Sequence, residues 1–238
     1  MATYERAHVS KLFDCLAEIA HRLIIITGPR QTGKTTLVRK ALARIRRPHH
    51  YLAVDEPETA TLPSFPTLAE GMALPSTRLF VPLGHERDLQ WLDRHWERAR
   101  IEASHSERGF VLVLDEIQKI PNWSEAVKGL WDADRRHGRQ LHVVLLGSAP
   151  LRMQQGLTES LAGRFETIRL THWSFAEMAA TFDFDFRSYV YFGGYPGGAP
   201  YIHEPDRWRA SILTALGGIG DDVRFPCYRN GLITRRPA

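Results

Sequence analysis

One segment of the chain has the composition and spacing of a phosphate-binding loop. Residues 28–36 read GPRQTGKTT and match the pattern G-x-x-x-x-G-K-[ST], between an apolar stretch and a helix predicted to begin near Lys34. Glycines let the backbone wrap closely around a phosphate, and the amides of the loop and of the helix N-terminus donate hydrogen bonds to its oxygens. Lys34 adds a positive charge, Thr35 offers a hydroxyl to Mg²⁺, and Thr36 would reach the α-phosphate. The residues expected to bind the nucleotide are Gly28, Pro29, Arg30, Gln31, Thr32, Gly33, Lys34, Thr35 and Thr36.

Two carboxylates follow a second apolar stretch. Residues 110–116 read FVLVLDE, a buried strand that ends in an acidic pair. Asp115 is expected to hold the hydration shell of Mg²⁺, and Glu116 to polarise the attacking water as general base. The alternative is an acidic cap on the following segment. Together with the loop, the pair predicts a site for a nucleoside triphosphate and Mg²⁺.

Two further residues are candidates for contact with the γ-phosphate. Ser148 lies just after the end of a predicted strand, and its hydroxyl would contact that phosphate or the water, although residues 147–150 also suit a simple turn. Arg164 follows a loop from the same side of the sheet and is expected to reach the γ-phosphate, with an ordinary salt bridge as the alternative. Whether Arg164 would act on the nucleotide of its own chain or of a neighbour stays open.

Alternating strands and helices must position these residues, a pattern that predicts a parallel sheet covered on both faces. The strands are predicted at residues 22–27, 50–54, 110–114 and 141–146, with a weaker one at 165–170. The first helix is predicted over residues 4–21, with an apolar face formed by Val9, Leu12, Phe13, Leu16 and Ile19. Further helices are predicted from residue 34, over residues 86–103, from an N-cap at Asn122 to about 136, and after a capping box at 174–177. Trp91 and Trp96 are expected to pack in the core, and residues 57–82, rich in Pro, Thr and Ser, to form a long loop.

Composition limits the class of protein. The chain has 238 residues, 43% hydrophobic and 24% charged, which is typical of a globular protein. Its apolar runs are far shorter than the roughly 18 residues of a membrane-spanning helix, and its first residues do not resemble a secretory signal, so a cytoplasmic location is expected. Cys15 and Cys227 suggest neither a disulfide nor a zinc site. The net charge of +4 includes basic clusters at residues 44–50 and 135–139, interpreted as helix termini, with a nucleic-acid contact as the alternative.

Several segments together resemble one known family. They are GPRQTGKTT at 28–36, DEIQKIP at 115–121, ESLAGR at 159–164, HWSF at 172–175 and YFGGYPG at 191–197. With these blocks in register, residues 5–223 look like the AAA-type ATPases of bacteria and archaea that usually carry a C-terminal DUF4143 region. The resemblance implies ATP and Mg²⁺ as ligands, the same roles for Lys34, Thr35, Asp115 and Glu116, and a small helical lid.

The expected fold class is therefore α/β: a P-loop NTPase three-layer sandwich with a parallel AAA-like sheet, plus the lid. The expected domains are an ATPase core at residues 1–170, the lid at 171–223 and an irregular tail at 224–238. Two departures from the family pattern matter. Leu146 stands where members usually have Thr, which shifts the sensor role to Ser148, and the chain ends where members continue into a winged-helix-like and C-terminal domain. The resemblance thus implies truncation, with the absent part carrying partner recognition.

Three functions compete at this point. The first is ATP hydrolysis that drives a conformational change, and the second is a nucleotide-operated switch with little intrinsic hydrolysis. The third, a DNA-dependent ATPase, draws on the D-E-x-Q pattern at residues 115–118. An N-K-x-D guanine reader and an L-S-G-G-Q block are absent from the sequence, which argues against a GTPase and an ABC transporter ATPase. A protein partner is expected, oligomerisation is open, and membrane association is not expected.

Overall fold

The computed structural model of this protein describes residues 4–55, 87–148 and 161–215. The long loop predicted over 57–82, the tail at 224–238 and Cys227 lie outside the described residues. The helices and strands, in chain order, are α1 (Ala7–Ala17), β1 (Leu23–Thr27), α2 (Lys34–Arg44), β2 (His49–Ala53), α3 (Leu89–Ser104), β3 (Phe110–Asp115), η2 (Ile117–Lys119), α4 (Trp123–Arg136), β4 (Leu141–Gly147), β5 (Phe165–Arg169), α6 (Phe175–Phe182), α7 (Phe186–Phe192), η3 (Ala199–Tyr201) and α8 (Pro205–Ala215).

The five strands form one parallel sheet in the order β2-β3-β4-β1-β5. All five predicted strands are confirmed to within one residue at each end. The strands β1, β3 and β4 are apolar runs buried on both faces, whereas the outer strands β2 and β5 are only partly buried. Strand β4 separates β1 from β3, and the carboxyl ends of all three meet along the same edge of the sheet. In open parallel sheets this edge is where ligands bind.

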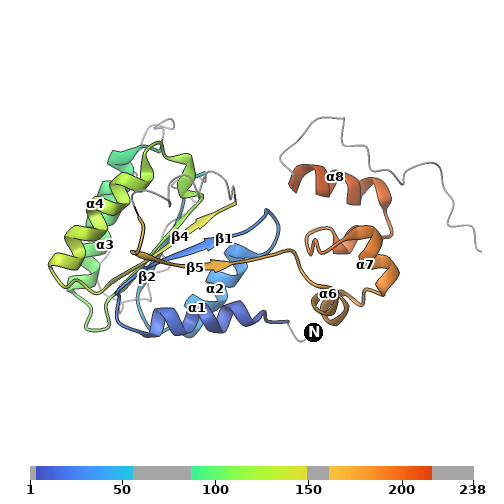
Figure 1. Cartoon of the computed structure of the whole chain (residues 1–238), viewed down its shortest axis with the longest axis horizontal. Helices are drawn as coiled ribbons and strands as arrows, with labels where there is room; N and C mark the ends of the chain where they lie inside the picture. The colour runs from blue at the N-terminus through green and yellow to red at the C-terminus, as the bar shows by residue number, and fades with distance from the viewer. Residues whose placement is uncertain (1–3, 56–86, 149–160, 216–238) are drawn as a thin grey trace, which may run out of the picture.

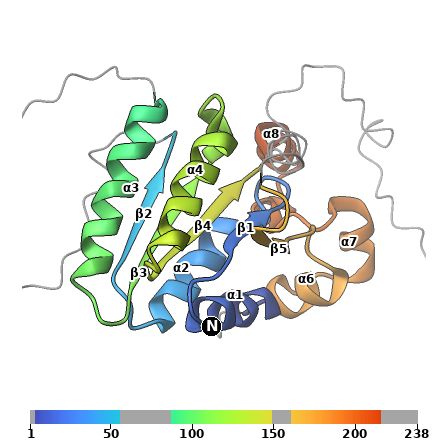
Figure 2. The same ribbon diagram turned by 60° about the vertical axis from the view of Figure 1, so that its left-hand side comes forward.

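Two layers of helices cover the sheet, so the molecule is an α/β three-layer sandwich, as predicted (Figures 1 and 2). Alternate residues of each strand face opposite layers. Along β1, Ile24 and Ile26 pack with α1 and α2, whereas Leu23 and Ile25 pack with α3 and α4. Because both faces are buried, the register of the strands is fixed along their whole length.

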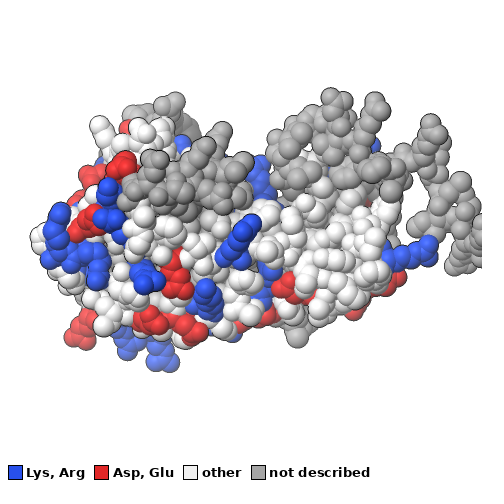
Figure 3. Space-filling model, viewed as in Figure 1, with Lys and Arg blue, Asp and Glu red and all other residues white. Residues whose placement is uncertain are grey.

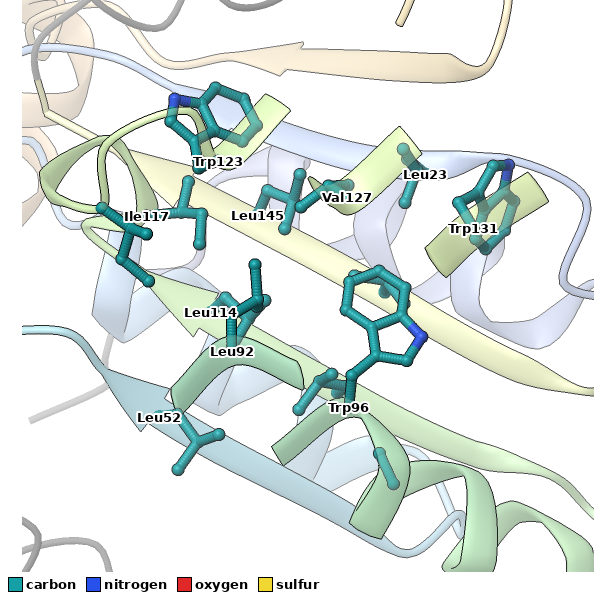
Figure 4. Packing of buried hydrophobic residues seen from close by; sticks show 14 of the residues in the cluster. Leu23, Leu52, Leu92, Trp96, Leu114, Ile117, Trp123, Val127, Trp131 and Leu145 are labelled. Carbon is teal, nitrogen blue, oxygen red and sulfur yellow. The ribbon is translucent and has the colours of Figure 1, made fainter. Parts of the chain in front are cut away.

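Tryptophans dominate the layer formed by α3 and α4 (Figure 4). Trp91 and Trp96 are 3% and 0% exposed, so their predicted place in the core is confirmed. Trp96 of α3 also donates its indole N–H to a carboxylate oxygen of Asp134 in α4, at 2.7 Å. Arg100 Nε donates to the other oxygen of Asp134 at 2.6 Å, and Arg139 adds a third contact at 2.9 Å. This buried carboxylate therefore joins α3 to α4.

We expect Asp134→Ala to lower the free energy of unfolding by about 3 kcal/mol, because it leaves a buried arginine and an indole N–H without their acceptor. Asp132→Ala on the same helix is the control, since its ion pair with Arg164 is about one third exposed and is expected to cost under about 1 kcal/mol. Urea unfolding of both variants measures the difference. Equal losses would contradict the structural role given to Asp134.

Helix ends were predicted less well than helix positions. The first helix ends at Ala17 instead of residue 21, and Ile19, expected on its apolar face, is 69% exposed. The carbonyls beyond the end of α1 bind arginine side chains instead of continuing the helix: Arg47 bonds to those of Leu16, Ala17 and Glu18, and Arg135 to that of Ala20. Members of both basic clusters thus act at the terminus of α1. The clusters also lie at the ends of their own helices, as predicted, with Arg44 in the last turn of α2 and Arg135 and Arg136 in the last turn of α4.

Capping explains the other boundaries. The third helix begins at Leu89, and the side chain of Asp88 accepts a bond from the amide of Trp91. The capping box of Ser174 and Glu177 is confirmed at the start of α6. Asn122 does precede α4, but its side chain makes no capping bond and its backbone is left-handed, with φ 56°. It is therefore an N-cap by position only.

The C-terminal helices α6, α7 and α8 lie beyond the carboxyl ends of the strands (Figure 1). They pack around a small apolar cluster of their own, with Met178, Phe184 and Ala199 buried in it. Charged side chains are sparse over α6 and α7 on the face shown in Figure 3. Within the described residues, no helix has the length and apolar character needed to cross a membrane.

Candidate nucleotide-binding site

The predicted phosphate-binding loop connects the end of β1, the strand beside the central strand β4, to the start of α2. Two of its residues must be glycine. A Cβ on Gly28 would lie 2.5 Å from the carbonyl oxygen of Leu170, and Gly33 has φ +88°, which favours glycine. Gly33 also supplies no side-chain cap to α2. The first amides of α2 therefore lack an intrachain side-chain acceptor, as in loops that bind anions.

Lys34 lies under this loop. Its ammonium nitrogen donates to the carbonyls of Gly28 at 2.9 Å and Pro29 at 2.8 Å, and the residue is 7% exposed. Burial lowers the pKa of Lys34, and the nearby carboxylates of Glu116 and Asp115 act in the opposite direction. The structure thus brings the lysine of the loop into the field of the acidic pair on β3.

Asp115 and Thr35 are in direct contact. The hydroxyl of Thr35 donates to Asp115 Oδ2 at 3.1 Å, and the amide of Glu116 donates to Asp115 Oδ1 at 2.9 Å. Burial raises the pKa of the Asp115 carboxyl, while the hydrogen bonds from Tyr51 and Thr35 oppose that rise. The phosphate-binding loop and the acidic pair at the end of β3 are therefore in contact in the folded chain, as the sequence predicted.

Tyr51 is a site residue that sequence reasoning did not find. Its phenol donates a hydrogen bond to Asp115 Oδ2, the same oxygen that Thr35 contacts. Burial, followed by the charge of Asp115, raises the pKa of the Tyr51 phenol. The guanidinium of Arg39 lies over the tyrosine ring, 5.6 Å from its centre. The available signal was a hydroxyl in β2 two residues before Ala53, which pairs with Asp115, and hence on the same face of the sheet.

Glu116 has an unusual backbone. Its φ of 56° and ψ of 35° lie in the left-handed region, which is uncommon for a residue other than glycine. The strand ends abruptly there, and the short helix η2 begins at Ile117. The side chain of Gln118 donates a hydrogen bond to the Glu116 carboxylate. Strain of this kind persists where the surroundings enforce it, often at functional sites.

Thr35 and Asp115 offer an oxygen-only set of donors side by side, a hydroxyl and a carboxylate, which suits Mg²⁺. Elsewhere among residues 4–55, 87–148 and 161–215, no cluster of three or more His, Cys, Asp or Glu side chains could hold a metal ion. These two oxygens would therefore supply part of the coordination of a magnesium ion, and a bound phosphate would supply another part.

The remaining candidates occupy different places. Ser148 follows Gly147, which pairs with Thr27, so it lies beside the start of the phosphate-binding loop. Arg164 lies at the opposite edge of the sheet, because its carbonyl accepts a bond from the amide of Leu23 at the first residue of β1. Its guanidinium is paired with Asp132 at 2.8 Å. Within one chain, the expectation that Arg164 reaches the γ-phosphate is therefore wrong, and the salt-bridge alternative is correct.

Comparisons with known proteins agree with this geometry. The model of one family, described as AAA domain, matches residues 20–179. A Walker-type ATPase of Pyrococcus abyssi has a similar structure, with a TM-score of 0.54 and 16% identity over 90% of this chain and 71% of that one. The ORC2 protein of Aeropyrum pernix in its ADP form gives a TM-score of 0.51 and 14% identity over 91% of this chain and 66% of that one. At such identities the likeness shows the fold alone. No curated protein matched the sequence.

Proposed function

Since this chain belongs to the AAA domain family, we propose that its phosphate-binding loop binds ATP with Mg²⁺ and that the chain hydrolyses the ATP. One observation carries the proposal: Lys34, Thr35 and the acidic pair at residues 115–116 meet at the carboxyl ends of the strands. A positive charge, a hydroxyl and two carboxylates at one place are the parts that phosphoryl transfer requires.

Binding would use the backbone of residues 28–33 and the first amides of α2 for the phosphate oxygens. Lys34 would exchange its contacts with the Gly28 and Pro29 carbonyls for contacts with phosphate. Thr35 and Asp115 would hold Mg²⁺, which when bound supplies positive charge that offsets the charge of the phosphate oxygens. Thr36 is exposed next to Thr35 and is proposed to reach the α-phosphate.

In the chemical step, the Glu116 carboxylate would accept a proton from water as the water oxygen bonds to the γ-phosphorus. The bond from that phosphorus to the bridging oxygen breaks, and ADP and phosphate are the products. The hydrogen bond from Gln118 would orient the glutamate. Ser148 is proposed to contact the γ-phosphate or the water from the end of β4.

The conformational part of the proposal concerns the helices after residue 170. We propose that α6, α7 and α8 belong to the expected lid at residues 171–223, which moves relative to the core at residues 1–170. Arg164 is given no role at the nucleotide of its own chain. Action on a neighbouring subunit would require it to leave Asp132.

A nucleotide-operated switch is the second candidate, and one feature favours it. The Lys34 ammonium is bonded to the carbonyls of Gly28 and Pro29, and it would have to leave them to contact phosphate, a change that requires nucleotide binding but not hydrolysis. Measuring ATP binding and phosphate release on the same sample separates the two functions. The DNA-dependent alternative gains no support from the face shown in Figure 3, where the basic and acidic side chains of the described residues are interspersed without a continuous basic stripe.

We expect Tyr51→Phe to raise the Mg²⁺ concentration needed for half-maximal nucleotide binding about tenfold, since partners that orient a metal ligand contribute to metal affinity at about that level. The phenol is one of the two side-chain hydroxyls that donate to Asp115 Oδ2. Titration of Mg²⁺ at fixed nucleotide measures the shift. Tyr201→Phe in η3, where the ring packs against Arg207, is the control. An unchanged Mg²⁺ midpoint would show that Tyr51 does not orient the carboxylate.

A further inference from the structure

The carbonyl of Thr32, within the phosphate-binding loop, is held from outside the loop. It accepts a hydrogen bond from the indole N–H of Trp173 at 3.2 Å and one from Arg6 Nη1 at 3.5 Å. Thr32 is 1% exposed, and its hydroxyl donates to the carbonyl of Pro29 at 2.9 Å. Neither external donor was a candidate in the sequence, because Arg6 precedes α1 and Trp173 lies just before α6.

The direction of this carbonyl also fixes the direction of the next N–H in the phosphate-binding loop. In a planar trans peptide the carbonyl and the following N–H point in opposite directions, so the Thr32 carbonyl sets the direction of the Gly33 N–H. Gly33 has φ +88° and no side chain that could restrain the peptide, and a Cβ added there would meet nothing within 4 Å. The two donors therefore determine how one of the loop amides is presented.

The same two donors belong to a network that includes the first turn of α6. Arg6 Nε is paired with Glu177 at 2.8 Å, and the Arg6 guanidinium lies over the ring of Trp173, 5.5 Å from its centre. Glu177 in turn bonds to the amide of Ser174 at 2.8 Å in the capping box of that helix. The Arg6 and Glu177 side chains are only 8% and 16% exposed. Solvent therefore screens this ion pair less than it screens a surface pair.

A second contact joins the neighbouring loop residue to α8. Gln31 Nε2 donates to the carbonyl of Ser211 at 3.4 Å. A Cβ on Gly197 would lie 2.9 Å from the side-chain oxygen of Gln31, so the chain before η3 also approaches the loop closely. The C-terminal helical segment thus contacts two consecutive residues of the loop, Gln31 and Thr32.

We propose that Trp173 and Arg6 are positioning residues, which orient the Thr32–Gly33 peptide toward phosphate and so link nucleotide binding to the docking of α6. The inference rests on the proposed function, since it concerns the same nucleotide. Linkage is reciprocal: if docked helices favour the binding-competent loop, bound nucleotide favours docked helices to the same degree. The Thr32–Gly33 peptide group thereby couples nucleotide binding at the loop to the docking of the C-terminal helices.

The test compares two conservative variants of the full chain. Trp173→Phe keeps an aromatic ring and removes the indole donor to Thr32. Tyr189→Phe is the matched control, because it removes the 3.0 Å bond from its hydroxyl to the Trp173 carbonyl in the same helical segment and leaves the indole donor to Thr32 in the sequence. We expect Trp173→Phe to weaken Mg-ADP binding in calorimetry about fivefold, the effect of one hydrogen bond, and Tyr189→Phe to change it less than about twofold.

Amide hydrogen exchange gives a second readout. Mg-ADP is expected to slow exchange of the amides of α6 in the wild-type chain and in Tyr189→Phe, and to do so much less in Trp173→Phe. Arg6→Lys, which keeps a positive charge for Glu177 and loses the guanidinium donors to Thr32, is expected to weaken binding in the same direction.

Three outcomes would overturn the inference. If Trp173→Phe binds ADP as tightly as the wild type does, Trp173 has no positioning role. If Tyr189→Phe weakens ADP binding equally, the loss reflects general loosening of the helices and not the indole donor. If the wild-type chain binds no nucleotide, the proposed function fails and the inference falls with it. Binding by the wild type separates that failure from the first two.

Discussion

Glu116→Gln is expected to lower the rate of ATP hydrolysis at least about 100-fold, the usual contribution of a general base, while leaving ATP affinity nearly unchanged. Glutamine keeps the shape of the side chain and accepts no proton from water. The left-handed backbone of Glu116 is also retained, since amide and acid impose the same steric demands. Single-turnover phosphate release and equilibrium ATP binding are measured on the same preparation.

The control for this variant is Glu125→Gln in the first turn of α4, a glutamate outside the site. It is expected to hydrolyse ATP at the wild-type rate. Glu116→Gln that retains more than about one tenth of the wild-type rate would contradict the assignment, because loss of a general base costs at least about 100-fold.

Lys34→Ala is expected to weaken ATP binding by roughly 10- to 100-fold, which corresponds to a charged hydrogen bond of about 1.5–3 kcal/mol. The ammonium is buried and bonded to the loop carbonyls, so the variant loses a cation at the phosphate-binding loop itself. Calorimetric titration with Mg-ATP measures the loss.

Lys40→Ala on the same helix is the matched control, because the Lys40 ammonium donates to the carbonyl of Tyr4 and not to the loop. It is expected to bind ATP as the wild type does. Urea unfolding of both variants shows whether either change acts through stability. Unchanged affinity in Lys34→Ala would place the nucleotide elsewhere.

The features that the sequence predicted are those encoded locally. The inner strands β1, β3 and β4 appeared as apolar runs, because they pack on both faces, and the loop appeared as a fixed pattern of glycines, lysine and threonine. The acidic pair was recognisable because it directly follows a buried strand. The fold class and the pairing of loop with acidic pair followed from these local signals.

The features that the sequence did not predict depend on contacts between distant residues. Tyr51 reaches Asp115 only because β2 pairs with β3, and the order of strands is not written in any one of them. Trp173 meets Thr32 only after α6 docks against the loop. The amphipathic pattern of the first helix also extended to Ile19, although arginine side chains from elsewhere bind the carbonyls at its end.

Arg164 shows the same limit most clearly. Its position shortly after a strand end suggested the catalytic edge, but the chain has crossed the molecule by then, and Arg164 precedes β5 instead of following it. Parallel strands begin at the edge opposite their carboxyl ends, so a residue just before a strand lies far from the loop. The position of Arg164 depends on the direction of β5, which begins at the next residue, and the sequence around Arg164 does not indicate that direction.

Hydrolysis of ATP by this chain is tested by measuring phosphate release from Mg-ATP, with ATP binding followed in the same sample and Glu116→Gln measured beside the wild type. We expect both proteins to bind ATP and only the wild type to release phosphate over successive turnovers. Binding by both proteins without phosphate release from either would contradict hydrolysis by this chain and favour the nucleotide-operated switch. Absence of ATP binding to the wild type would contradict the site itself.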